Sequence, residues 1–88
     1  MTDLSIIIVN WNTRELLEAC LNSLSSEQDA LAMEIFVVDN GSTDGSVEWL
    51  KQERPDVALI ANADNEGFAK ANNVALLRCT GRHILLLN

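Results

Sequence analysis

The sequence predicts an α/β fold in which a Rossmann-like, mostly parallel sheet carries helices on both of its faces. Four short apolar runs alternate with three segments of helical periodicity, the order expected of parallel strands joined by right-handed crossover helices. The first and last runs lack polar alternation, which is typical of strands buried on both faces of a sheet. At 88 residues the chain has room for one domain, so we expect residues 1–88 to form one unit.

The expected strands are the four apolar runs, residues 4–9, 35–38, 57–61 and 83–87. A first helix is expected to begin at Asn12, because Asn12 and Glu15 have the spacing of a capping box. Its inward stripe follows the helical period and consists of Leu16, Leu17, Cys20, Leu21 and Leu24.

The second helix is expected to start within residues 42–44, to direct Val47 and Leu50 inward, and to end before Pro55. A third helix is expected over residues 67–79, with Gly81 closing it. The residues expected near its buried face are Phe68, Ala69, Asn72, Leu76 and Cys79.

The chain is acidic, with 13 acidic and 6 basic residues and a net charge of -7. This balance argues against a nucleic-acid partner and against adsorption to an anionic membrane, since both need a basic face. An acidic protein can still bind a phosphorylated small molecule when backbone N–H groups and a metal ion supply positive charge.

The cysteines Cys20 and Cys79 lack metal-ligand spacing, so we expect reduced thiols in the core; a disulfide is the alternative. Asp3 interrupts the start of the chain and the apolar run after it is short, which predicts no signal peptide. No run approaches the roughly 20 apolar residues that cross a bilayer. The expected location is cytoplasmic.

Polar residues follow the apolar runs, and ligands of open parallel sheets bind beyond the carboxyl ends of the strands. The segments in these places are residues 10–12, 39–46 and 62–67, followed by Asn88. Asp39 can accept a hydrogen bond from a base N–H or a ribose hydroxyl, or can act only as a turn residue. Trp11 can stack on a base or serve as a packing lid, and Asn12 is interpreted as a helix cap.

Residues 65–73 open the third helix with Gly67 and small residues, which permits the close approach of a ligand. Adjacent amides inside a helix are unfavourable unless they bond to something, so at least one of Asn72 and Asn73 should be buried and bonded to a loop or to the strand ends. Leu76 should lie in the core. Lys70 either contacts phosphate or is solvated. Neither a G-x-G-x-x-G motif nor a P-loop motif is present in the sequence.

Four segments, residues 5–12, 37–46, 65–73 and 85–88, together resemble family 2 glycosyltransferases, with the rhamnosyltransferase-like branch as the nearest match. The most specific of them reads V-V-D-N-G-S-T-D-G-S, and G-F-A-K-A-N-N adds independent weight. The resemblance covers the whole chain in order.

The resemblance implies the nucleotide-binding half of a GT-A fold, and we expect this chain to be a truncated, N-terminal fragment of such an enzyme. The implied reaction is the inverting transfer of a hexosyl or rhamnosyl group from a UDP- or dTDP-type nucleoside-diphosphate sugar to a saccharide or lipid-linked acceptor. The residues that match the family's donor-nucleotide site are Val9, Asn10, Trp11, Asp39, Asn65, Gly67, Lys70 and Asn73.

Asn88 matches the first position of the family's D-x-D motif, whose last carboxylate holds Mg or Mn. The chain ends before that carboxylate, so we assign no catalytic residue and expect the fragment to bind no metal and to be inactive. The whole enzyme is expected to associate peripherally with the inner membrane, and the open edge of the last strand favours self-association.

Two other classes of protein are weighed. A receiver-type signalling domain would need an acidic pair after the first strand, where this chain has Asn10, Trp11 and Asn12. A non-catalytic nucleotide-binding or scaffold module of α/β type is the stronger alternative.

Overall fold

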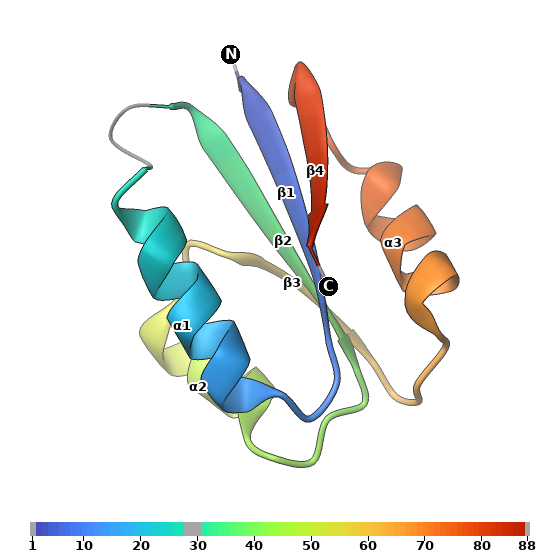
Figure 1. Ribbon diagram of the computed structural model, residues 1–88. Helices are drawn as coiled ribbons and strands as arrows, with labels where there is room; N and C mark the ends of the chain where they lie inside the picture. Colours follow the sequence, from blue (N-terminus) through green and yellow to red (C-terminus); the bar gives the residue numbers. More distant parts are fainter. Residues whose placement is uncertain (1, 28–30, 88) are drawn as a thin grey trace.

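The computed structural model describes residues 2–27 and 31–87. Its seven elements are β1 (Leu4–Asn10), α1 (Arg14–Ser25), β2 (Met33–Asn40), α2 (Ser46–Glu53), β3 (Ala58–Asn62), α3 (Phe68–Leu76) and β4 (His83–Leu87). The strands form one sheet in the order β3-β2-β1-β4, and every neighbouring pair is parallel (Figure 1). The expected α/β class with a parallel sheet is confirmed.

Helices α1 and α2 cover one face of the sheet and α3 covers the other (Figure 1). The chain first moves outward from β1 to β3 and then returns across the sheet to β4. Because parallel crossovers are right-handed, this change of direction sends α3 to the opposite face. The strand order therefore reverses between β1 and β4, and the carboxyl ends of these two strands meet at a topological switch point.

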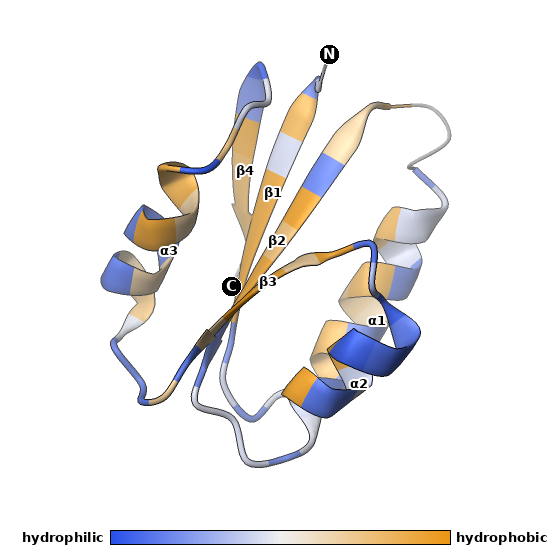
Figure 2. Ribbon diagram, turned by 180° about the vertical axis from the view of Figure 1, so that it is seen from behind, coloured by the Kyte–Doolittle hydropathy of each residue, from blue (hydrophilic) through white to orange (hydrophobic). Residues whose placement is uncertain are grey.

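The core consists of two apolar layers, one on each face of the sheet. Alternating residues of β1 illustrate this, because Ile6 and Ile8 pack toward α1 and α2 whereas Ile7 packs toward α3. The helices contribute Leu21 and Leu50 to the first layer, and small alanines of α3 to the second. Figure 2 shows the resulting hydrophobic sheet between more hydrophilic helices.

Helix α1 differs from the prediction at its start. Leu17 and Leu21 are buried as expected, but Leu16 is 72% exposed. The helix begins at Arg14, and Asn12 does not cap it. Asn12 instead adopts a left-handed backbone with φ of 52° and its side chain accepts a hydrogen bond from another loop, so the predicted capping box is wrong.

Helix α2 ends at Glu53, before the proline, as predicted, although it begins at Ser46 and not within residues 42–44. Leu50 is buried and Val47 is half-buried. Both cysteines are free and half-buried, and burial raises the pKa of each thiol.

The buried face of α3 differs from the prediction. The helix ends at Leu76, and the residues that pack on the sheet are Ala71, Asn72 and Ala75. Phe68, Ala69 and Leu76 are exposed, so placing Leu76 in the core was wrong. Small side chains let a helix approach a sheet closely, and here they turn the larger apolar residues outward.

At the amino end of the sheet, Glu34 of β2 fixes the entry into β4. Its Oε2 accepts hydrogen bonds from the Thr80 backbone N–H at 2.6 Å and from the Ser5 hydroxyl. Burial alone would raise the pKa of Glu34, but these bonds together hold it below its ordinary value. Gly81 lies so close to β1 that a Cβ atom would stand 2.6 Å from the Ser5 nitrogen, so its role is close packing after the end of α3.

Candidate functional site

A cavity of about 300 Å³ lies at the carboxyl ends of β1 and β4, at the switch point of the sheet. Its lining combines apolar side chains with a few amides, and includes Val9, Asn10, Trp11, Asn40, Asn65 and Phe68. Leu16, which the helical period placed in the core, also lines this cavity. Both the volume and the mixed lining are typical of a small-molecule site.

A buried pair of polar residues, Asp39 and Asn10, lies at the edge of the site, and of the two only Asn10 lines the cavity. The two residues lie side by side in the register of β1 and β2, and are 0% and 1% exposed, respectively. The amide Nδ2 of Asn10 donates to Asp39 Oδ1 at 2.9 Å. Asp39 also accepts from the Ser42 backbone N–H at 2.9 Å and from the Ser42 hydroxyl at 2.7 Å. A buried carboxylate is thus satisfied by three hydrogen bonds.

The loop after β1 and the loop after β2 are bonded directly to each other. The Ser42 hydroxyl accepts from the Asn12 backbone N–H at 2.9 Å, and Asn12 Oδ1 accepts from the Thr43 N–H at 2.7 Å. Thr13 completes the contact by donating its hydroxyl to Asn10 Oδ1 at 2.7 Å. These bonds occupy the side chain of Asn12, which explains why it does not cap α1.

A second set of amides joins the loops that follow β2 and β3. Asn40 and Asn62 are paired in register, and Asn62 Nδ2 donates to Asn40 Oδ1 at 3.0 Å. Asn40 Nδ2 in turn donates to the carbonyl oxygen of Gly67 at 3.3 Å. Asn65 Oδ1 accepts from the Gly67 N–H at 2.9 Å, which shapes the turn into α3. The start of α3 is thereby tied to the same edge of the sheet as Asp39.

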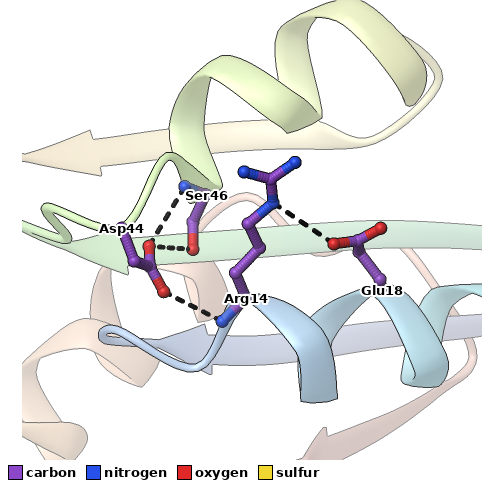
Figure 3. Close-up of polar contacts among 4 residues, drawn as sticks. All are labelled: Arg14, Glu18, Asp44 and Ser46. Carbon is purple, nitrogen blue, oxygen red and sulfur yellow. Dashed lines mark hydrogen bonds and ion pairs between the residues drawn. The ribbon is translucent and has the colours of Figure 1, made fainter.

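Asp44 joins the first turns of two helices (Figure 3). Its Oδ2 accepts from the Arg14 N–H at the start of α1 at 3.0 Å, and its Oδ1 accepts from the Ser46 N–H at the start of α2 at 3.1 Å. Burial alone would raise the pKa of Asp44, but hydrogen bonds from Ser46 and Arg14 together lower it below its ordinary value. The side chain of Arg14 extends along α1 to Glu18, at an N–O distance of 3.2 Å (Figure 3).

The structure brings part of the predicted donor-site set together. Val9, Asn10, Trp11 and Asn65 line the cavity, and Asp39 is hydrogen-bonded to Asn10 beside it. Gly67 is connected to this edge only through its bonds to two asparagines.

Two members of the predicted set lie away from the cavity. Lys70 is 67% exposed and its Nζ lies 3.4 Å from Glu66 Oε1, and Asn73 is exposed on α3. Asn88, proposed from the sequence for a metal, lies outside the described residues.

The sequence placed Asn40, Ser42 and Asn62 in the polar segments that follow the strands, but none of the three was named as a binding residue. The hydrogen bond between Asn40 and Asn62 follows from the fold, because asparagine ends each of β1, β2 and β3 and parallel strands bring such ends together.

Asn72 is 4% exposed, in keeping with the expectation that one of the two adjacent amides is buried. Its Nδ2 donates to the Phe68 carbonyl of its own helix at 3.1 Å, and not to a loop or a strand end. Its Oδ1 has no partner among the described residues.

Residues 2–27 and 31–87 contain no group of three or more His, Cys, Asp or Glu side chains that could hold a metal ion. The buried carboxylate of Asp39 is already bonded to three donors, which does not suit a metal ligand. In the part of the chain that the structure describes, no helix has both the length and the apolar character needed to cross a membrane.

Comparison with known proteins identifies relatives over the whole sheet. Residues 5–88 match the family described as Glycosyl transferase family 2. The chain is 35% identical over 79 residues to the Bacillus subtilis protein named uncharacterized glycosyltransferase YfnE, covering 88% of this chain and 20% of that protein. It is also 35% identical over 74 residues to the N-acetylglucosaminyl-diphospho-decaprenol L-rhamnosyltransferase of Mycobacterium tuberculosis, covering 83% and 24% of the two chains.

Solved structures share the fold. The mannosyltransferase PcManGT of Pyrobaculum calidifontis, solved in complex with GDP-Man and Mn2+, superposes with a TM-score of 0.75 at 33% identity, over 92% of this chain and 25% of that one. TarS of Staphylococcus aureus superposes with a TM-score of 0.80 at 26% identity, over 98% and 16%. The chain thus spans about a quarter or less of these proteins, and the α/β arrangement expected of the GT-A fold is confirmed.

Proposed function

The chain belongs to glycosyl transferase family 2, and from this premise we propose that it forms the donor-nucleotide site of a glycosyltransferase. The observation that carries the proposal is the cavity at the switch point between β1 and β4, whose lining residue Asn10 is hydrogen-bonded to the buried carboxylate of Asp39. Open parallel sheets bind nucleotides at such points. The transfer reaction itself is proposed for the whole protein.

In the proposed site, Trp11 stacks on the nucleobase and Asp39 receives its N–H. Trp11 lines the cavity and is 52% exposed, so the face of its indole is accessible. Asp39 Oδ2 accepts one bond, from Ser42, and a carboxylate oxygen can accept two. Because Asp39 is buried before ligand binding, the proposal requires the side chains above it to move when the base enters.

Val9 and Asn10 line the cavity beside Trp11 and are proposed to contact the base, and Asn65 and Gly67 are proposed to contact the ribose. Lys70 and Asn73 are proposed for the phosphate side of the donor. Lys70 is exposed, and its Nζ lies 3.4 Å from the Glu66 carboxylate. An exposed ion pair contributes little free energy, so an incoming diphosphate can replace Glu66 as the partner of Lys70. Neither Lys70 nor Asn73 lines the cavity, and both lie in the segment 65–73 that resembles the family motif.

For the whole protein we propose inverting transfer of a hexosyl or rhamnosyl group from a UDP- or dTDP-type sugar to a saccharide or lipid-linked acceptor. The Mycobacterium relative named as a rhamnosyltransferase supports the sugar, whereas PcManGT was solved with GDP-Man, which carries a different base. No residue that the structure describes is assigned to activating the acceptor.

A divalent ion, Mg or Mn, belongs to the proposal for the whole protein, as PcManGT was solved with Mn2+. It would offset the charge of the diphosphate, but residues 2–27 and 31–87 do not form a site for it and no step is assigned to it. A cytoplasmic location with peripheral attachment to the inner membrane stays a prediction.

The proposal is tested by titrating UDP, dTDP and GDP into the chain while the fluorescence of Trp11 is recorded. Trp49→Phe removes the only other tryptophan, which lies on α2 and packs against the core. We expect a saturable change in Trp11 fluorescence with at least one nucleoside diphosphate. Inorganic diphosphate should cause no change, because it has no base that can stack on the indole. The absence of any saturable change with all three nucleotides at millimolar concentration would contradict the proposal.

A further inference from the structure

Asn12 directly follows Trp11 and has an unusual backbone. Its φ of 52° lies in the left-handed region, and it is the one described residue other than glycine with positive φ. Asparagine tolerates this region better than most residues, but the conformation persists only where the surroundings hold it. The surroundings here are two hydrogen bonds to the loop after β2.

These two bonds are reciprocal and form the inter-loop contact, which we define as Asn12, Ser42 and Thr43. The Asn12 N–H donates to Ser42 Oγ at 2.9 Å, and the Thr43 N–H donates to Asn12 Oδ1 at 2.7 Å. The Ser42 hydroxyl donates in turn to Asp39 Oδ1 at 2.7 Å. One hydroxyl group therefore connects the backbone beside Trp11 to the buried carboxylate.

Trp11 is held from both sides by this arrangement. On its other side, Asn10 donates to Asp39 at 2.9 Å and lies 3.3 Å from Ser42 Oγ. Both neighbours of the tryptophan thus bond to Ser42, which lies in the loop after β2. Asn10 bonds in addition to Asp39 and Asn12 to Thr43, while the indole itself is half exposed beside the cavity.

From this geometry we propose that Asn12 is a positioning residue, which sets the place of Trp11 relative to Asp39 through the inter-loop contact. It touches no base itself in this role. In the proposed function, Trp11 stacks on the base and Asp39 accepts a hydrogen bond from it. Asn12 then fixes the distance between Trp11 and Asp39.

The side chain and the backbone of Asn12 can be tested separately, all in the Trp49→Phe chain. Asn12→Gly tolerates the positive φ but removes the side-chain acceptor. Asn12→Ala removes the acceptor and also disfavours the backbone conformation. Asn12→Asp keeps an acceptor for the Thr43 N–H, and Asn22→Ala changes an exposed residue of α1 as a control.

The first readout needs no ligand: acrylamide quenching and anisotropy of Trp11, measured well below each variant's unfolding midpoint. We expect quenching to rise and anisotropy to fall in Asn12→Gly and Asn12→Ala, because the hydrogen bond from the Thr43 N–H to Asn12 Oδ1 is lost. Asn12→Asp should restore the parent values, and Asn22→Ala should leave them unchanged. Unchanged Trp11 signals in Asn12→Gly would overturn the inference, even if that variant were less stable.

The second readout is the affinity for UDP, dTDP or GDP, which depends on the proposed function. Asn12→Gly should weaken binding about fivefold or more, the factor that corresponds to one hydrogen bond. If Trp11 becomes mobile in this variant while the parent chain binds no nucleotide, the proposed function fails and the positioning role of Asn12 stands. If nucleotide binding is intact in Asn12→Gly with Trp11 unchanged, the positioning role fails and the proposed function stands.

Discussion

Replacing Asp39 by alanine should be one of the most destabilising single changes in this chain. The substitution removes three hydrogen bonds and takes the acceptor away from three donors, which are the Ser42 N–H, the Ser42 hydroxyl and Asn10 Nδ2. Asn10 is 1% exposed, and its Nδ2 keeps only a 3.3 Å hydrogen bond to Ser42 Oγ. Leaving a buried donor unsatisfied costs about 1–3 kcal/mol, and part of this is offset because a buried charge is also removed.

We therefore expect Asp39→Ala to lower the free energy of unfolding by about 2–4 kcal/mol. A domain of this length has a total of about 4–13 kcal/mol, so the loss is a large fraction. Urea unfolding followed by circular dichroism measures it. Asp64→Ala, an exposed acid in the loop after β3, is the matched control and should change stability by less than about 0.5 kcal/mol. Equal losses in the two variants would refute the reasoning that Asp39 is a satisfied, buried acceptor.

Asp39→Asn should lower the free energy of unfolding by only about 1 kcal/mol, because the new amide oxygen can still accept a hydrogen bond from Ser42 if Asn10 reverses its own amide. For Gly41→Ala we expect the free energy of unfolding to fall by about 2 kcal/mol or more, because φ is 81° and the new Cβ would stand 2.9 Å from the Ala63 carbonyl oxygen. The same unfolding assay measures this loss, and an unchanged midpoint would contradict it. The free energy of unfolding should also fall in acid, because the pKa of Asp44 is lower in the folded chain than in the unfolded chain, which therefore binds protons more readily. The stabilisation that Asp44 contributes is complete above about pH 5 and is lost as the pH falls through the folded-state pKa. Thermal melts of Asp44→Asn should show a shallower decline between about pH 5 and pH 2, and parallel profiles would count against it. The exposed apolar residues of β4 should promote self-association, so Leu85→Lys should reduce the mass measured by light scattering at high concentration. A parent chain that is a monomer at this concentration would refute the expectation.

The sheet and the location of the site could be predicted because they depend on strong, local patterns. Runs of β-branched and other apolar residues predict buried parallel strands, and the carboxyl ends of such strands share one edge. These two patterns are sufficient to predict that Asn10, Trp11 and Asp39 gather at a single place.

The bonds between loops could not be predicted, because they join residues about thirty positions apart. Asn12 has the sequence signature of a cap, yet its side chain is bonded to Thr43 across the site. Capping strength and an inter-loop bond compete for the same oxygen, and only the positions of β1 and β2 decide between them.

The prediction of the buried face of α3 was wrong for a different reason. Its helical period is compatible with two neighbouring stripes, and the prediction chose the one with the larger residues, including Leu76. Close packing selected Ala71 and Ala75 instead, since the distance between the helix and the sheet leaves little room for longer side chains. A sequence pattern contains no information about that distance.

The central claim, that a nucleoside diphosphate binds at the carboxyl edge of this sheet, is tested most directly by NMR. Amide chemical shifts of the chain would be followed during titration with the nucleotide that changes Trp11 fluorescence. We predict that the shifts concentrate in residues 9–12, 39–43 and 65–67, and that Glu34, Thr80 and Gly81 at the opposite end stay unchanged. Saturable shifts confined to the amino end of the sheet, or spread evenly over α1 and α2, would contradict it.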